Sequence, residues 1–242
     1  MKHIAVIFAG GTGQRMHTKA LPKQFLEVHG KPVLIYTLEQ FERHPQIDGI
    51  VLVCLEGWID YAEKLLKRFY ITKVAKIVPG GKIGQDSIFR GLTAAREIWG
   101  EANTVVLIHD GVRPMIDGDT ISRCIASVEA RGNAVTTVPA IETIFVRNGK
   151  EGQAGQIFRR SDCEMARAPQ CFRLKDIYEA HLRAQGEGRD DFVDSASLMQ
   201  HYGHTLFTVQ GPMENIKITT PMDFYVFRAL LDAKEDLQIM GV

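Results

Sequence analysis

The sequence has few of the features that identify secreted, membrane or metal-binding proteins. Only four cysteines occur in 242 residues and none belongs to a C-x-x-C pair, a pattern that indicates neither a zinc site nor a disulfide framework. No apolar run approaches the length of a bilayer crossing, and the N-terminal run leads into a glycine-rich loop instead of a cleavage site. We therefore expect a soluble, cytoplasmic protein with no membrane partner.

An excess of charge of either sign is also absent. The 29 basic residues are balanced by 29 acidic ones, so no overall field attracts nucleic acid, and we expect no nucleic-acid partner. Any positive charge that binds an anionic ligand must therefore be local. A hydrophobic fraction of 45% and 22 glycines are typical of a compact α/β protein with many tight turns.

The two commonest nucleotide-binding motifs are missing as well. No Gly-Lys-Ser/Thr occurs, which excludes a P-loop, and Met16 stands where the dinucleotide fingerprint needs its third glycine. What is present is an apolar run, residues 4–9, that ends at G-G-T-G and is followed by Arg15 and Lys23. The backbone N–H groups of such a loop can bind an anion, and the two cations add fixed charge. The stretch predicts a nucleoside triphosphate site, although a plain glycine turn beside two surface cations would have the same pattern.

This stretch, with P-K-Q at residues 22–24, resembles the nucleotide loop A-G-G-x-G-x-R-M of the polyol-phosphate cytidylyltransferases. Further matches to that family follow in the family's order: G-G-K-I-G-Q-D-S from Gly80, H-D-G-V-R-P from His109, A-P-Q from Ala168 and N-I-K-I-T-T-P from Asn215. The resemblance implies an enzyme that transfers CMP from CTP to a polyol phosphate and releases pyrophosphate. Its partners would be these two substrates, and its cofactor Mg²⁺.

The resemblance also assigns roles to individual residues. It implies four catalytic residues: Arg15, Lys23, Lys217 and, from a neighbouring subunit, Arg160. It implies that Asp110 contacts both the acceptor and Mg²⁺, and that Arg113 and Thr143 bind the acceptor; without the resemblance, Asp110 could also be a cap of the next helix. The residues expected to bind CTP are Phe8, Ala9, Gly10, Gly11, Gly13, Gly80, Gly81, Lys82 and Ser87. His109 receives no chemical role and is expected to be structural.

Three positions depart from the family pattern. Gly84 stands where some members have an arginine, while Ala168 and Val193 replace threonines of the acceptor pocket. The spacing of Arg15 and Lys23 and the H-D-x-V-R-P motif resemble the ribitol branch more than the methylerythritol branch. The resemblance thus favours D-ribitol 5-phosphate as acceptor, giving CDP-ribitol for teichoic acid or capsule. The alternative is 2-C-methyl-D-erythritol 4-phosphate, for isoprenoid synthesis; a sugar-1-phosphate nucleotidyltransferase and a non-catalytic CTP-binding protein also remain open.

The order of apolar runs predicts the architecture. Strand patterns alternate with helical patterns at residues 4–9, 49–55, 73–78 and 104–110. This alternation favours an α/β, Rossmann-like nucleotidyltransferase fold, with a mostly parallel sheet and helices on both faces. Ligands bind at the carboxyl ends of such strands, where both glycine-rich loops are expected to lie.

Later segments carry finer predictions. From about residue 139 to 162, two short alternating strands around Asn148-Gly149 predict a protruding β-hairpin arm, which by resemblance would form a homodimer. The rest of residues 1–242 is expected to be one domain. Lys217 is expected on a short strand, followed by a helix that begins at Thr220-Pro221 and ends near Ala233.

Overall fold

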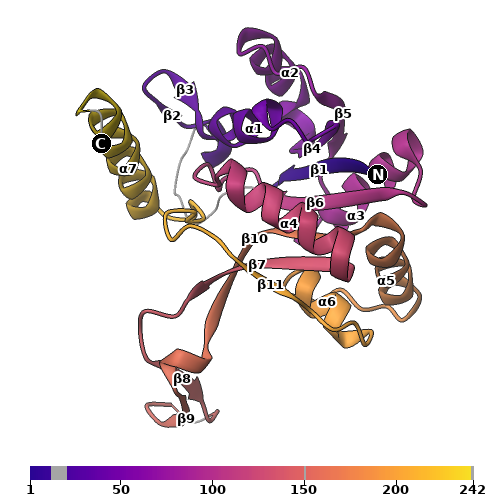
Figure 1. The fold of residues 1–242 in the computed structure, drawn as a ribbon, viewed down its shortest axis with the longest axis vertical. Coiled ribbons are helices and arrows are strands. Elements are labelled where there is room, and N and C mark those ends of the chain that lie inside the picture. Colours follow the sequence, from indigo (N-terminus) through magenta and orange to yellow (C-terminus); the bar gives the residue numbers. More distant parts are fainter. Residues whose placement is uncertain (12–20, 150, 241–242) are drawn as a thin grey trace.

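The computed structural model describes residues 1–11, 21–149 and 151–240, and these residues form a seven-stranded sheet in the order β11-β7-β10-β6-β1-β4-β5 (Figure 1). The strands are β1 (Lys2–Ala9), β4 (Gly49–Cys54), β5 (Val74–Pro79), β6 (Thr104–Asp110), β7 (Asn133–Pro139), β10 (Glu164–Arg173) and β11 (Thr208–Gln210). Of the strands described in this sheet, β10 alone runs antiparallel to its neighbours. The predicted mostly parallel sheet is therefore confirmed.

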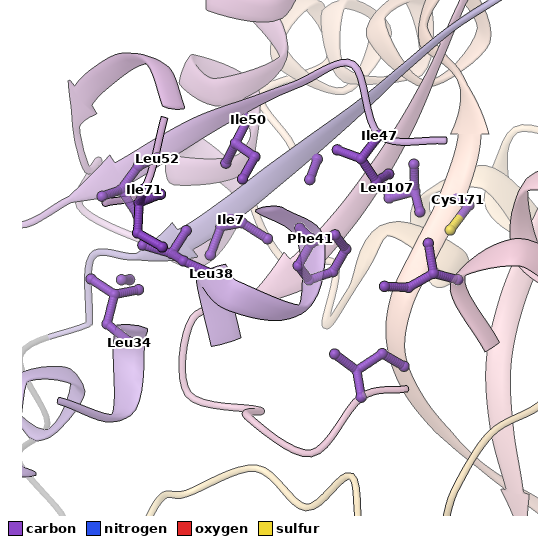
Figure 2. Close-up of a cluster of buried hydrophobic side chains, with 14 of the residues drawn as sticks. Ile7, Leu34, Leu38, Phe41, Ile47, Ile50, Leu52, Ile71, Leu107 and Cys171 are labelled. Atoms are coloured by element: carbon purple, nitrogen blue, oxygen red, sulfur yellow. The ribbon is translucent and has the colours of Figure 1, made fainter. Parts of the chain in front are cut away.

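Helices cover both faces of the sheet, as predicted. One face carries α1 (Val33–Arg43), α2 (Ile59–Arg68) and α4 (Gly118–Arg131); the other carries α3 (Gly84–Trp99), α5 (Leu174–Gly186) and α6 (Ser195–His201). Successive residues of β1 point to opposite faces, so Ile7 packs in the first layer and Val6 in the second. Figure 2 shows the first layer, in which Ile7 lies beside Leu38 and Phe41 of α1. Of the described residues, none forms a helix long and apolar enough to cross a membrane.

The predicted hairpin is present as a separate two-stranded antiparallel sheet, β8 (Ile144–Arg147) with β9 (Ala154–Phe158). It lies away from the large sheet in Figure 1. Its connection is longer than the predicted turn at Asn148-Gly149, because two glycines with positive φ, Gly149 and Gly152, each turn the chain.

Two short strands were not predicted, β2 (Glu27–Val28) and β3 (Lys31–Pro32), which pair around a turn at His29-Gly30. The strand β10 was not predicted from the sequence either. Proline is unusual in a central strand, but here the pairing of β10 with β7 shifts register between Ala166 and Gln170, which leaves Pro169 outside the regular ladder.

Two predictions for the C-terminal part were wrong. Lys217 does not lie on a strand: the backbone N–H of Ile218 donates to Val112 O at 3.0 Å, and no ladder forms among the described residues there. The last helix, α7 (Pro221–Met240), continues well past Ala233, because residues 234–240 include no glycine or proline that would end it. Its predicted start is confirmed.

Candidate active site

In the described part of the chain, two adjoining cavities open at the carboxyl edge of β1 and β6. They share the lining residues Phe8, Ile83, Gly84, Asp110 and Lys217. We call the one of about 620 Å³ the glycine-loop cavity; its further lining includes Gly10, Gly11, Lys23, Gly81, Lys82 and Ser87. We call the one of about 370 Å³ the β10 cavity; its further lining includes Arg113, Arg167, Ala168, His181, Val193 and Asp194.

The glycine-loop cavity is shaped by the backbone of two loops that lie close together. A Cβ on Gly10 would lie 3.4 Å from Gly80 Cα, so the loops after β1 and β5 touch. A Cβ on Gly81 would overlap the side chain of Asp86. The Ser87 hydroxyl accepts from Gly81 N and donates to Ile83 O, both at 3.0 Å. These two hydrogen bonds close the second loop, and Ser87 also lines the cavity.

The segment P-K-Q joins the first loop to the rest of the cavity. Gln24 is buried, and its Nε2 donates to Ala9 O at 2.7 Å. Lys23 precedes Gln24 in the chain. Its Nζ donates to the backbone oxygen of Ile218 at 3.0 Å, and Ile218 directly follows Lys217. Gln24 therefore positions the loop, a role that the sequence analysis did not assign although its motif contains the residue. The candidate residues Gly13 and Arg15 lie outside the described residues.

Asp110 holds two cations at the boundary between the cavities. Its Oδ1 accepts from Lys217 Nζ at 2.5 Å and its Oδ2 from Arg113 Nε at 2.8 Å. Burial raises the pKa of Asp110, but the charges and hydrogen bonds of Lys217 and Arg113 outweigh burial and lower that pKa below its ordinary value. Asp110 is consequently ionised at neutral pH and fixes the Lys217 ammonium in place.

His109, next to this ion pair, is structural as expected. It is fully buried, its Nε2 lies 3.0 Å from Arg113 O, and its ring lies 5.1 Å from that of Phe41. Burial lowers its pKa to about 4. The imidazole is therefore neutral at pH 7 and supports the backbone of Arg113.

The β10 cavity is held together by side-chain amides that the sequence analysis did not single out. Asn215 accepts from Arg113 Nη1 through its backbone carbonyl at 2.9 Å and donates from Nδ2 to Ala168 O at 2.7 Å. Gln170 donates to Asp194 Oδ2 at 2.8 Å and accepts from Ala196 N at 2.9 Å. Both amides belong to recognised motifs, A-P-Q and N-I-K, so those motifs could have indicated them.

Thr143 and Arg160 are not brought to either cavity within one described chain. Both are exposed on the hairpin segment, and Arg160 Nη1 donates to Ile141 O at 3.2 Å. Their predicted contacts with substrate would need a second copy of the chain.

The surroundings of Asp110 fit the predicted Mg²⁺ contact poorly. Each carboxylate oxygen of Asp110 already accepts from a cation, and the described residues include no group of three or more His, Cys, Asp or Glu side chains that could hold a metal. A direct Mg²⁺ contact would have to displace Lys217 or Arg113, or share an oxygen with one of them.

A mostly parallel sheet with a glycine-rich loop and a cationic cavity at its carboxyl edge is an arrangement in which α/β proteins bind nucleotides. Residues 3–233 match the IspD model, described as 2-C-methyl-D-erythritol 4-phosphate cytidylyltransferase. The chain belongs to this family of nucleotidyltransferases.

Individual relatives extend over the whole chain. A ribitol-5-phosphate cytidylyltransferase of Vibrio parahaemolyticus is 49% identical over 239 residues, which are 99% of this chain and 100% of the relative. A 2-C-methyl-D-erythritol 4-phosphate cytidylyltransferase of Clostridium botulinum is 37% identical over 231 residues, 96% of this chain and 98% of the relative. The solved structure of the 4-diphosphocytidyl-2C-methyl-D-erythritol synthase of Anaerococcus prevotii superimposes with a TM-score of 0.80 at 26% identity, covering 96% of each chain.

Proposed function

We propose that this protein transfers CMP from CTP to D-ribitol 5-phosphate and releases pyrophosphate. The observation that carries the proposal is the pair of adjoining cavities. One is lined by two glycine loops and Lys23, and Lys217 lines both. Ribitol is favoured as acceptor because the V. parahaemolyticus relative that carries the ribitol name is 49% identical, against 37% for the C. botulinum relative named for methylerythritol.

We assign one substrate to each cavity. The triphosphate of CTP lies in the glycine-loop cavity, where backbone N–H groups and Lys23 bind its oxygens. The polyol phosphate lies in the β10 cavity, with its phosphate at the boundary beside Lys217. An oxygen of that phosphate attacks the α-phosphorus in line. The bond from the α-phosphorus to the oxygen bridging to the β-phosphate breaks, and pyrophosphate leaves.

The protein's main task is to bring two anions together. Lys217 lines both cavities, so its ammonium can neutralise the attacking phosphate and the α-phosphate at once. Asp110 keeps that ammonium in one position, which avoids reorganisation when charge shifts in the transition state. No covalent intermediate is needed.

We further propose Mg²⁺ as the cofactor; it would be held mainly by the CTP phosphates and would neutralise part of their charge. Mg²⁺ commonly uses few protein carboxylates and several phosphate oxygens, which accords with an Asp110 already engaged by two cations. Removal of Mg²⁺ with excess EDTA is expected to abolish turnover, and added Mg²⁺ to restore it.

The hairpin is proposed to pair with a second copy of the chain. Its apolar side chains are exposed, with 58% of Ile141, 56% of Phe145 and 58% of Ile157 accessible, and an isolated two-stranded hairpin is marginal in water. Pairing would cover these side chains and would allow Thr143 and Arg160 to approach the neighbour's β10 cavity. We place the homodimer in the cytoplasm, without a nucleic-acid partner.

Pyrophosphate release with Mg²⁺ and CTP, measured separately with ribitol 5-phosphate and methylerythritol phosphate, tests the function. Turnover with ribitol 5-phosphate alone is expected. Turnover with methylerythritol phosphate alone would show that the acceptor is wrong while the reaction is right. CTP binding without pyrophosphate release from either acceptor would contradict the proposed activity.

A further inference from the structure

Arg167 lies in the β10 cavity for a reason that can be traced along its strand. The pairing of β10 with β7 shifts register between Ala166 and Gln170, and such irregularities turn a side chain away from its regular direction. Arg167 lines the cavity together with Ala166, Ala168 and Val193, none of which has a hydrogen-bonding side chain. Arg167 is therefore the polar group of this part of the wall.

Arg167 differs from the other basic residues of the β10 cavity. Arg113 and Lys217 are both ion-paired with Asp110, whereas Arg167 forms no ion pair or hydrogen bond with any other described residue, and its buried Nε has no partner. Burial, and the nearby charge of Arg113, lower the pKa of Arg167. A partly buried guanidinium without a partner is unfavourable, and an anion in the cavity would satisfy it.

The acidic residues of the cavity do not take that place. The two oxygens of Asp194 accept from Ser197 N and from Gln170 Nε2, at 2.8 Å each. Asp190 is exposed and makes no ion pair with Arg167 in the described structure. No acidic side chain of the described cavity therefore pairs with Arg167.

We propose that Arg167 binds the phosphate of the acceptor within its own subunit. The inference rests on the proposed function, which puts a polyol phosphate in this cavity. Asn215 ties the backbone next to Arg167, at Ala168 O, to Arg113 and so to Asp110. This chain of hydrogen bonds fixes the backbone at Arg167 close to the boundary between the cavities, where the acceptor phosphate must meet the α-phosphorus. A guanidinium can bind such a phosphate through two parallel hydrogen bonds.

The test compares Arg167→Ala and Arg167→Lys with wild type in steady-state pyrophosphate release. Arg167→Ala is expected to raise KM for ribitol 5-phosphate by about ten- to a hundredfold, the range for hydrogen bonds to a charged group, with KM for CTP unchanged. Arg167→Lys should recover part of the loss, since lysine keeps the charge but not the fork. Arg173→Ala is the control, because Arg173 is exposed at the other end of β10 and lines neither cavity as described.

Glycerol 3-phosphate separates a phosphate contact from a hydroxyl contact. It is measured as a substrate or, where it is not turned over, as a competitive inhibitor against ribitol 5-phosphate. A similar loss of affinity for both compounds in Arg167→Ala supports the proposal. A loss confined to ribitol 5-phosphate would overturn it, because Arg167 would then contact hydroxyls of the longer chain.

The remaining outcomes distinguish the two proposals. An active wild type with an unchanged acceptor KM in Arg167→Ala overturns the Arg167 assignment alone. Equal rises in both KM values, or a lowered melting temperature with no KM change, show a structural role and also overturn it. A wild type that is silent with every polyol phosphate overturns the proposed function, and the Arg167 assignment with it.

Discussion

The two cavities of the active site are built in different ways. The glycine-loop cavity is formed by backbone of loops that directly follow β1 and β5, with close contact between Gly10 and Gly80. The β10 cavity is formed by side chains from distant segments, such as Arg113, Arg167 and Val193. Backbone recognises a phosphate whatever is attached to it, whereas side chains select what is attached. Under the proposed function, this difference would assign CTP to the first cavity and the acceptor to the second.

The comparison can be tested most strongly at the boundary, where Lys217 serves both cavities. Lys217→Ala should lower turnover by about a thousandfold, the upper range for loss of one group that stabilises a transition state. The assay is pyrophosphate release at saturating CTP and acceptor. Lys175→Ala, on the exposed surface of α5, is the control. Turnover within a few-fold of wild type would mean that the boundary is not the reaction centre.

Lys23 tests the glycine-loop cavity by itself. Lys23→Ala should lower turnover by about a hundredfold because one cation at the triphosphate is lost, while KM for the acceptor stays the same because Lys23 does not line the β10 cavity as described. Steady-state kinetics with each substrate varied in turn measures both quantities. Normal turnover would contradict the assignment of CTP to this cavity.

A methyl group added at Gly81 is expected to weaken CTP binding in the same cavity without removing a charge. In Gly81→Ala the added Cβ would overlap the Asp86 side chain, so the loop must shift, and KM for CTP should rise about tenfold, equivalent to about 1.4 kcal/mol. Gly57→Ala is the matched control, since its Cβ would meet no described atom within 4 Å. An unchanged KM for CTP in Gly81→Ala would show that the loop's backbone does not bind the triphosphate.

The difference in construction also explains what the sequence could predict. The glycine-loop cavity follows from contiguous motifs, so Gly10, Gly81 and Lys23 could be singled out from the chain itself. Gly13 and Arg15 stay predictions, since they lie outside the described residues. Arg167 had no such signal. It is an arginine between two alanines, and its place in the cavity depends on the register shift of β10 and on the packing around it.

The fold shows the same division. Strands and helices that alternate with strong periodicity, such as β1 and α1, could be predicted from apolar spacing, because burial on a sheet determines that spacing. The strand β10 was not predicted since Pro169 interrupts its pattern, and its antiparallel direction depends on neighbours β6 and β7. The predicted roles of Thr143 and Arg160 would depend on a second chain, and that information is not present in the contacts of one chain.

The last expected effect is on stability instead of catalysis and concerns pH and the wall of the β10 cavity. His181 lines this cavity, is buried, and has no hydrogen-bond partner on either ring nitrogen among the described residues. Burial lowers its pKa from 6.5 to about 4. His181 therefore binds a proton near pH 6.5 in the unfolded chain but only near pH 4 in the folded chain. The stability contributed by this group is complete above pH 6.5 and is lost as pH falls toward 4.

At pH 5 this linkage costs about 2 kcal/mol of unfolding free energy. His181→Phe should remove that loss while keeping the ring contact with Phe89, now at 5.7 Å between ring centroids. Urea unfolding at pH 7 and pH 5 measures the difference, and exposed His201→Gln is the control. The variant should retain part of the acid sensitivity, because His109 in the neighbouring β6 also has a pKa lowered to about 4 by burial. An unchanged difference between the two pH values in His181→Phe would mean that His181 is solvated, and the wall of the β10 cavity would then be more open than that of a closed specificity pocket.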